Sequence, residues 1–353
     1  MKAFWVINAA NIILAICIIC GALLITSCSS PPPSSTTSKI INTTQTPNKT
    51  KSLLTASATS TEEKQKPTQT PSVTITSQTT TTQKTSISFT ETPKRTVTST
   101  KQATLRPNEW KKLPVIPTIH PDVKKIFMHG IELGNNPKAF SKIGDCGSTP
   151  AWFLGDFDRG EKFYDLGDYD TLKDVIDYYQ GSFGRTSLAA RSGFNASSLF
   201  VSIWADRSYC NSNEAPLACE YRQFKPSLAF IMLGSNDVWH PEEFEPQMRK
   251  IIDYSLEKGV IPILSTKADN IEEDGRINDT IARLSQEYHI PLWNFWLAME
   301  DLPNRGLQED NVHLTFGRNF FDDPEVMQKA WSVRNLSALQ VLDAIWKEVS
   351  GLR

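Results

Sequence analysis

The chain has almost no net charge. Its 353 residues carry 37 lysines and arginines against 39 aspartates and glutamates, which gives a formal charge of −2 at pH 7. A strong field of one sign is therefore absent, and this excludes the broad basic surface with which proteins bind nucleic acids or acidic surfaces. We expect no nucleic-acid partner.

Large apolar residues are scarce between residues 29 and 104, where serine, threonine, proline, lysine and glutamine dominate. Such a segment cannot bury enough surface to offset the conformational entropy that folding removes. We predict a disordered tether over residues 28–105, and square-root scaling gives it an r.m.s. reach of about 50 Å. Globular structure is expected only in residues 106–353.

The longest apolar run lies at the N-terminus. Lys2 precedes an apolar stretch over residues 12–25, which is short for a bilayer span and typical of an export signal. The stretch ends in Leu24, an isoleucine, two small residues and Cys28, a pattern that resembles the bacterial lipobox. The resemblance implies removal of residues 1–27, lipidation of Cys28, and an exported protein anchored by lipid to the outer face of the cytoplasmic membrane. The alternative is an uncleaved apolar helix that serves as a plain membrane anchor and gives the same location.

The sequence has six cysteines, and few of them remain for pairing after export. Two leave with the signal and Cys28 carries the lipid, which leaves Cys146, Cys210 and Cys219 in an oxidising compartment. Cys210 and Cys219 flank a short polar loop, and we predict a disulfide between them. Cys146 is then the odd cysteine, and a leftover thiol is either buried and inert or reactive.

Short apolar runs and longer amphipathic segments alternate in the C-terminal part of the chain. We expect strands at residues 139–143, 227–233, 260–265 and 291–296, and helices at residues 121–133, 171–179, 241–257, 277–288 and 336–349. The strand segments are continuous apolar runs, which is typical of a parallel sheet covered on both faces. The sequence therefore predicts an α/β fold.

Three motifs that carry reactive side chains follow the expected strands or lie near the C-terminus. Cys146 stands in a turn flanked by glycines, Asn236 follows the strand at residues 227–233, and Asp310 precedes His313 by three residues. Functional groups of such sheets gather beyond the carboxyl ends of the strands, so these groups can form one site.

The spacing of Asp310 and His313 suits a catalytic base. A carboxylate three residues away can hold one imidazole nitrogen in the right tautomer, while the other nitrogen removes the proton of Cys146, which attacks a carbonyl. The amide of Asn236 and the backbone N–H of Gly193 can donate to an oxyanion, each worth about 3 kcal/mol in the transition state. An Asp-X-X-His pair alone is a weak signal, and Asn236 with Asp237 also fits an ordinary turn or helix cap.

This ordered set resembles the SGNH, or GDSL-like, hydrolases. In that family a Gly-Asp-Ser block carries the nucleophile, a later Gly and an Asn complete the oxyanion hole, and Asp-X-X-His closes the triad. The resemblance covers residues 139–349 and departs from the pattern in one place, because Cys146 stands where the family has serine. It implies a three-layer α/β/α sandwich with a flavodoxin-like, five-stranded sheet, and an esterase acting on acetyl groups, acyl esters or thioesters, including those on glycans. It implies no metal and no organic cofactor, and we expect a monomer.

Several alternatives stay open from the sequence. A site shaped for serine can bind its ligand and turn over slowly with the larger sulfur of Cys146, which makes a non-catalytic module that binds carbohydrate or acyl ligands the main rival. Ser148 is a second, less suitable nucleophile because it is displaced by two residues.

The remaining candidates are aromatic residues and histidines. Trp152, Trp239 and His240 flank the motifs and can line a sugar or acyl pocket, or belong to the core. His120 and His129 are interpreted as structural or exposed, since neither has acidic or thiol neighbours at metal-ligand spacing. Asp156 and Asp158 suggest a calcium loop, but residues 156–160 are not followed by the other ligands that such a loop requires.

Overall fold

The computed structural model describes residues 105–351. The predicted signal at residues 1–27, Cys28 and nearly all of the predicted tether lie outside the described residues, and these predictions stay predictions. Within the described range, no helix combines the length and the apolar character needed to cross a membrane.

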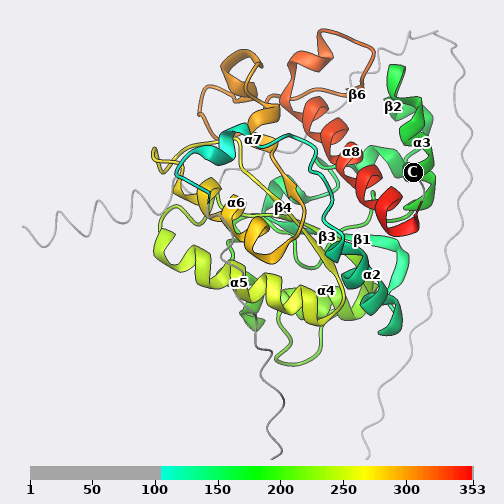
Figure 1. Cartoon of the computed structure of the whole chain (residues 1–353), viewed down its shortest axis with the longest axis vertical. Helices are drawn as coiled ribbons and strands as arrows, with labels where there is room; N and C mark the ends of the chain where they lie inside the picture. The colour runs from blue at the N-terminus through cyan, green and yellow to red at the C-terminus, as the bar shows by residue number, and fades with distance from the viewer. Residues whose placement is uncertain (1–104, 352–353) are drawn as a thin grey trace, which may run out of the picture. The chain divides into compact units, whose positions relative to one another are not determined.

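Four parallel strands form the central sheet (Figure 1). They lie in the order β1 (Asn136–Gly144), β3 (Pro226–Met232), β4 (Ile261–Ser265) and β5 (Leu292–Trp293). All residues of β3 and β4 are buried, as expected for continuous apolar runs in a sheet covered on both faces. The predicted α/β class is confirmed.

The fifth strand is reduced to one bridge. Ala190 forms a parallel bridge with Gly144 at the free edge of β1, and the backbone N–H of Arg191 donates to the carbonyl of Gly144 at 3.1 Å. With this bridge counted as a second strand, the order is the 2-1-3-4-5 of flavodoxin-like sheets. The chain turns away at Gly193, where φ is +80°, so the contact does not extend into a regular strand.

Side chains of alternate strand residues face two separate cores. Phe140, Phe230 and Ile263 pack with α2 (Asp122–Glu132), α3 (Lys173–Tyr178) and α8 (Ala330–Ser350). Ile143 and Ile231 pack on the opposite face with α4 (Pro216–Phe224), α5 (Pro241–Glu257) and α6 (Arg276–Tyr288). The sheet is therefore the middle of three layers, and this arrangement places every strand's carboxyl end at one edge.

The shorter elements lie mostly in the connections. A second sheet pairs β2 (Tyr164–Asp165) with β6 (Asn319–Phe320) in parallel, and α7 (Phe295–Ala298) follows β5. The 3-10 helices are η1 (Glu109–Lys112), η2 (Cys146–Ser148), η3 (Gly155–Asp158), η4 (Glu161–Phe163), η5 (Gly167–Leu172), η6 (Ser197–Phe200), η7 (Ser202–Trp204), η8 (Pro303–Gly306) and η9 (Val326–Gln328).

Several elements differ from the sequence prediction. The strand expected at residues 291–296 ends at Trp293, because Asn294 turns the chain into α7 by accepting from the N–H of Leu297 and donating to the carbonyl of Trp110. α8 begins six residues earlier than expected, at Ala330. α4 was missed, since its first residues were assigned to a polar loop.

The predicted disulfide between Cys210 and Cys219 is confirmed. It joins the loop before α4 to the buried face of that helix. Asp158, one of the acids considered for calcium, accepts from the backbone N–H groups of Gly181 and Gly184 at 2.8 and 2.6 Å. That carboxylate therefore holds a loop in place.

Two glycines allow α2 to cross the amino ends of the strands closely. A Cβ atom at Gly130 would lie 2.2 Å from the carbonyl oxygen of Gly259, the residue two positions before β4. Asn135 donates to the carbonyls of Lys258 and Gly259 beside this contact. The backbone of α2 at Gly130 therefore contacts the backbone at Gly259, and a side-chain rotation cannot relieve a clash there.

We expect Gly130→Ala to lower the free energy of unfolding by about 1 to 3 kcal/mol, the usual cost of overpacking. The sign of this stability change is informative, because in a helix without such a contact alanine is more stable than glycine by about 1 kcal/mol. Urea denaturation measures the change, and Met128→Ala at an exposed position of α2 serves as the control. Equal stability of the two variants would contradict the close crossing.

Candidate active site

The turn that carries Cys146 follows β1 directly. The carboxylate of Asp145 accepts from the backbone N–H of Gly147 at 2.9 Å, and the N–H of Thr149 donates to the carbonyl of Cys146, which closes the single turn η2. A Cβ at Gly144 would lie 2.3 Å from the carbonyl oxygen of Met232, so only glycine permits this exit from the strand. The turn leaves Cys146 partly exposed at the carboxyl edge of the sheet.

Ser148 does not share that exposure. Its side chain is fully buried, and its hydroxyl would lie 2.3 Å from a Cβ at Gly144, directly beneath the turn. The two-residue displacement from Cys146 directs this hydroxyl into the interior. Ser148 is therefore not placed as a nucleophile that a substrate can reach.

The interpretation of Cys146 as the odd cysteine was wrong for this structure. Cys146 is disulfide-bonded, and Cys210 and Cys219 bond to each other. The sequence prediction treated Cys146 as the remaining cysteine because it assumed that the three N-terminal cysteines are removed or lipidated. A bonded sulfur has no thiolate until the bond is reduced.

Arg334 supports the turn from below and was missed by the sequence analysis. Its guanidinium donates to the carbonyl of Gly147 at 2.9 Å and lies 4.9 Å from the ring centroids of Phe153 and Trp331. Burial lowers the pKa of Arg334 to about 10. The only sequence signal is an arginine within the mostly apolar start of α8.

Asp145 is the carboxylate beside this buried cation. Burial raises its pKa, while the charge of Arg334 and the hydrogen bond from the Gly147 N–H lower it, and the balance lies above the usual value. The charge of His313 also acts on Asp145.

The predicted Asp310–His313 pair is formed. The Nδ1 atom of His313 lies 2.6 Å from Oδ2 of Asp310, and the backbone N–H groups of Val312 and His313 both donate to Oδ1 at 2.9 Å. Asn311 adopts φ of +58°, which makes the turn tight enough for these contacts. Partial burial raises the pKa of Asp310, hydrogen bonds from His313 lower it, and the balance lies below the usual value.

The first turn of α8 holds both loops. The backbone N–H groups of Ala330 and Trp331 donate to the hydroxyl and the carbonyl of Thr315, two residues after His313. The ring of Trp331 lies 3.7 Å from the position that a Cβ atom at Gly147 would take. Arg334 donates to the carbonyl of Gly147. One helical turn therefore fixes the histidine loop beside the turn of Cys146.

The two predicted oxyanion donors lie on neighbouring loops. The side-chain amide of Asn236 donates to the carbonyl of Phe194 at 3.0 Å, which connects the loop after β3 to the turn at Gly193. Gly193 has φ of +80° and open space around its Cα. Among residues 105–351 its backbone N–H has no hydrogen-bond acceptor, so the group remains available to a ligand.

A buried ion cluster lies beneath the Asn236 loop and was also missed. The ammonium of Lys267 contacts the carboxylates of Asp269 and Glu272, each at 2.5 Å, and the hydroxyl of Ser235 donates to Asp269. These charges are almost fully buried and pair with one another, as buried charges must. They fix Ser235 and with it the start of the loop that carries Asn236.

The aromatic candidates separate into two groups. Trp152 stacks on Trp331 at 5.4 Å and packs against the core, so it lies beside the first turn of α8. Trp239 is 72% exposed, and His240 is exposed at the start of α5. Trp152 thus supports the site, whereas Trp239 presents a bare ring to solvent.

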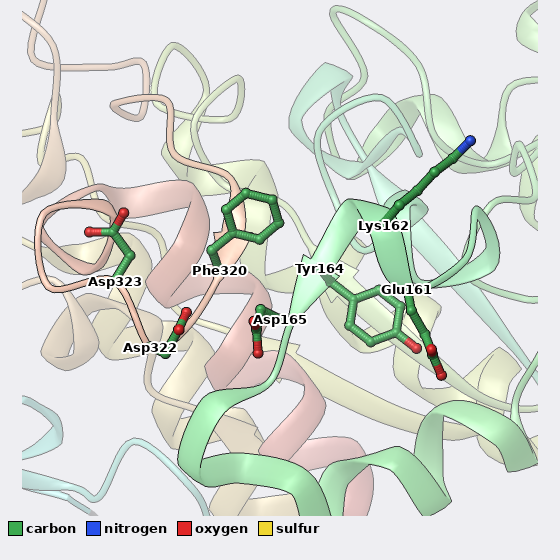
Figure 2. Close-up of a pocket in the computed structure, with 7 residues that line it drawn as sticks. All are labelled: Glu161, Lys162, Tyr164, Asp165, Phe320, Asp322 and Asp323. Atoms are coloured by element: carbon green, nitrogen blue, oxygen red, sulfur yellow. The ribbon is translucent and has the colours of Figure 1, made fainter.

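A pocket lies beside the small β2–β6 sheet (Figure 2) and contains none of the predicted site residues. It is lined by Glu161, Lys162, Tyr164, Asp165, Phe320, Asp322 and Asp323. Its carboxylates surround an open, polar hollow. The candidate active site and this pocket are formed by different residues.

Comparisons with known proteins give a distant likeness. No protein-family profile matches the sequence, and no curated protein matches it. A GDSL-like lipase from Bacteroides thetaiotaomicron is similar at 14% identity and a TM-score of 0.34, over 59% of this chain and 94% of that one. An acetyl xylan esterase is similar at 18% identity and a TM-score of 0.34, over 61% and 100% of the two chains. A catalytic mutant of an acetylxylan esterase from Geobacillus stearothermophilus is similar at 15% identity and a TM-score of 0.34, over 61% of this chain and 95% of that one. Likenesses at these TM-scores do not by themselves assign a function to this chain.

Asp237 provides a test of the loop after β3. Burial raises its pKa to about 6, Oδ1 accepts from the Ala196 N–H, and Oδ2 has no partner among the described residues. The folded state therefore binds this proton more tightly than the unfolded state, and stability falls as pH rises from about 4 to 6.

We expect Asp237→Asn to raise the free energy of unfolding at pH 7 by about 1 to 3 kcal/mol, at 1.36 kcal/mol per pKa unit. The gain should shrink at pH 4, where Asp237 is itself protonated. Urea denaturation at the two pH values measures this difference. A variant that is less stable than the parent at pH 7 would contradict the proposed burial of an unpaired oxygen.

Proposed function

We propose that the domain formed by residues 106–353 hydrolyses ester bonds of acetyl or other acyl groups. The observation that carries this proposal is the Asp310–His313 pair, held by the first turn of α8 beside the turn of Cys146. The resemblance of the motifs to SGNH hydrolases and the flavodoxin-like strand order support the same reaction class.

In a chain that keeps residues 1–28, the reaction begins once a thiol reductant has converted the disulfide at Cys146 to the thiol. Removal of residues 1–27 and lipidation of Cys28 would instead remove or block the cysteines that can bond it. His313 removes the proton of that thiol, with Asp310 holding the opposite ring nitrogen, and the thiolate attacks the ester carbonyl. The Gly193 N–H and the Asn236 amide donate to the oxyanion that forms. His313 returns the proton to the leaving alkoxide, which yields a thioester on Cys146.

Hydrolysis of the thioester completes the cycle. His313 takes a proton from water, the resulting hydroxide attacks the thioester carbonyl, and the proton returns to the sulfur as the carboxylic acid departs. No metal and no organic cofactor take part in these steps. The reaction thus requires only side chains of this chain, water and the prior reduction.

We also propose where the reaction takes place and on what. The lipobox-like Cys28 and the Ser/Thr/Pro-rich residues 28–105 support a monomeric domain tethered by lipid at the cell surface. The exposed ring of Trp239, three residues after Asn236, offers a stacking surface for a sugar. Acetylated or acylated glycans of the envelope are therefore the favoured substrate class. His240 follows Trp239 directly, and Trp152 lies beside the first turn of α8.

A second function, a non-catalytic module that binds the same ligands, is favoured by one observation. Cys146 is half of a disulfide, and in that state no nucleophile is present, while Gly193, Asn236 and Trp239 keep their places. The tether would then position a binding surface. Dependence on a reductant separates this module from the enzyme.

We expect the reduced protein to hydrolyse p-nitrophenyl acetate, with Cys146→Ala lowering kcat/KM at least 100-fold and His313→Gln lowering it by about 10²- to 10⁴-fold. Cys146→Ser should retain activity without reductant, since a hydroxyl forms no disulfide. His129→Gln, at a histidine far along the chain from the motifs, is the control. Initial rates with and without a thiol reductant measure these effects.

Two outcomes would contradict the proposal. Full activity of Cys146→Ala would exclude Cys146 as the nucleophile. Inactivity of the reduced parent and of Cys146→Ser, together with retained binding of acetylated xylo-oligosaccharides by calorimetry, would identify the binding module instead.

A further inference from the structure

His120, Asp122 and His289 form a cluster that the proposed function does not use. His120 precedes α2, Asp122 is its first residue, and His289 follows α6 three positions before β5. The cluster lies at the amino ends of the strands, whereas Cys146, Asn236 and His313 follow the carboxyl ends. The sequence interpretation of His120 as lacking acidic neighbours was wrong, because Asp122 lies beside it in space.

Both imidazoles direct the same nitrogen at one oxygen. The Nδ1 atoms of His120 and His289 lie 3.3 and 3.1 Å from Oδ2 of Asp122, and the two rings stack with centroids 4.2 Å apart. His289 holds this position with φ of +55°, a conformation that few non-glycine residues adopt. Two chain segments 167 residues apart thus converge on a single carboxylate oxygen.

These separations suit a tetrahedral metal ion. Zinc bonds of about 2.0 to 2.1 Å to nitrogen and oxygen place neighbouring tetrahedral ligands about 3.3 Å apart. The three donor atoms lie within 4.8 Å of one another, and the residues are partly exposed, so water can supply the fourth ligand. Because the two rings stack at an interplanar angle of 25°, the side chains must rotate to direct both in-plane lone pairs at one ion.

The hydrogen bonds of the cluster define the protonation of the His120 ring. The backbone N–H of Asp122 donates to Nδ1 of His120 at 3.2 Å, which requires that this nitrogen carry no proton. The single lone pair of Nδ1 accepts that N–H, so an ion would have to displace this hydrogen bond to join Nδ1 to the carboxylate oxygen 3.3 Å away. Lys125 pairs with the other oxygen, Oδ1, at 2.6 Å and leaves Oδ2 to the histidines.

We propose that Nδ1 of His120, Oδ2 of Asp122 and Nδ1 of His289 bind one Zn²⁺ ion, with water as the fourth ligand. Imidazole donors favour zinc and other borderline transition metals over Ca²⁺ and Mg²⁺, and the absence of sulfur from the cluster disfavours Cu⁺. The ion would join the start of α2 to the connection between α6 and β5. Its role is structural, because the cluster and the candidate active site lie at opposite edges of the sheet.

The test uses the purified chain in its oxidised form, treated with a chelator and then titrated with ZnCl₂ by calorimetry. We carry the His313→Gln change in all samples, so that the Asp310–His313 pair does not contribute a second site. We expect one equivalent of Zn²⁺ per chain, and a melting temperature raised by about 5 °C or more at a hundredfold excess over the dissociation constant.

Two variants identify the ligands without removing the local backbone conformation. Asp122→Asn keeps a polar side chain at the start of α2, and His289→Asn keeps a residue that tolerates positive φ. Each should weaken Zn²⁺ binding at least 10-fold and abolish the thermal shift, whereas His129→Gln should leave both unchanged. Co²⁺ substitution should give visible absorption bands of a four-coordinate ion in the parent and none in the variants.

Absence of Zn²⁺ binding by the parent would overturn the proposal and leave a proton-shared histidine pair on Asp122. Binding that survives both variants would overturn it as well, since the ion would then sit elsewhere. Because the readouts are heat, melting temperature and cobalt absorption, the result does not depend on whether the domain hydrolyses esters.

Discussion

The buried guanidinium of Arg334 is the contact on which the geometry of the candidate site depends most. It lies under the turn of Cys146, donates to the carbonyl of Gly147 and is enclosed by aromatic rings. An arginine is costly to bury, and its charge is balanced here by Asp145 and by carbonyl and aromatic partners. A side chain of α8 thereby holds a backbone carbonyl that lies 187 residues earlier in the chain.

The histidine loop depends on the same helix. Thr315 satisfies two backbone N–H groups of the first turn of α8, where a helix always has unpaired donors. Asp310 and His313 belong to a tight turn that leads into Thr315, so the helix start fixes their position relative to Arg334. The catalytic geometry we propose is therefore a consequence of how α8 begins, which the sequence prediction placed six residues too late.

Local sequence patterns were enough to predict the layers, most boundaries and the contacts that occur within a few residues. The parallel strands, the pairing of Cys210 with Cys219 and the Asp310–His313 contact all follow from short-range spacing and apolar runs. Arg334, the Lys267 cluster and the convergence of His120 with His289 could not be predicted, because each depends on packing between segments far apart in the chain. The bond at Cys146 could not be predicted either, since the choice of partner depends on which cysteines remain in the chain.

Hydrogen exchange in Arg334→Met, compared with the parent in the same oxidation state of Cys146, tests the central role of the buried cation most directly. The account predicts that amides of residues 145–149 exchange at least 10-fold faster than in the parent, because the turn loses its support from α8. Amides of β3 and β4 should keep their protection, which shows that the fold survives. Unchanged exchange at residues 145–149 in a folded Arg334→Met protein would contradict the account.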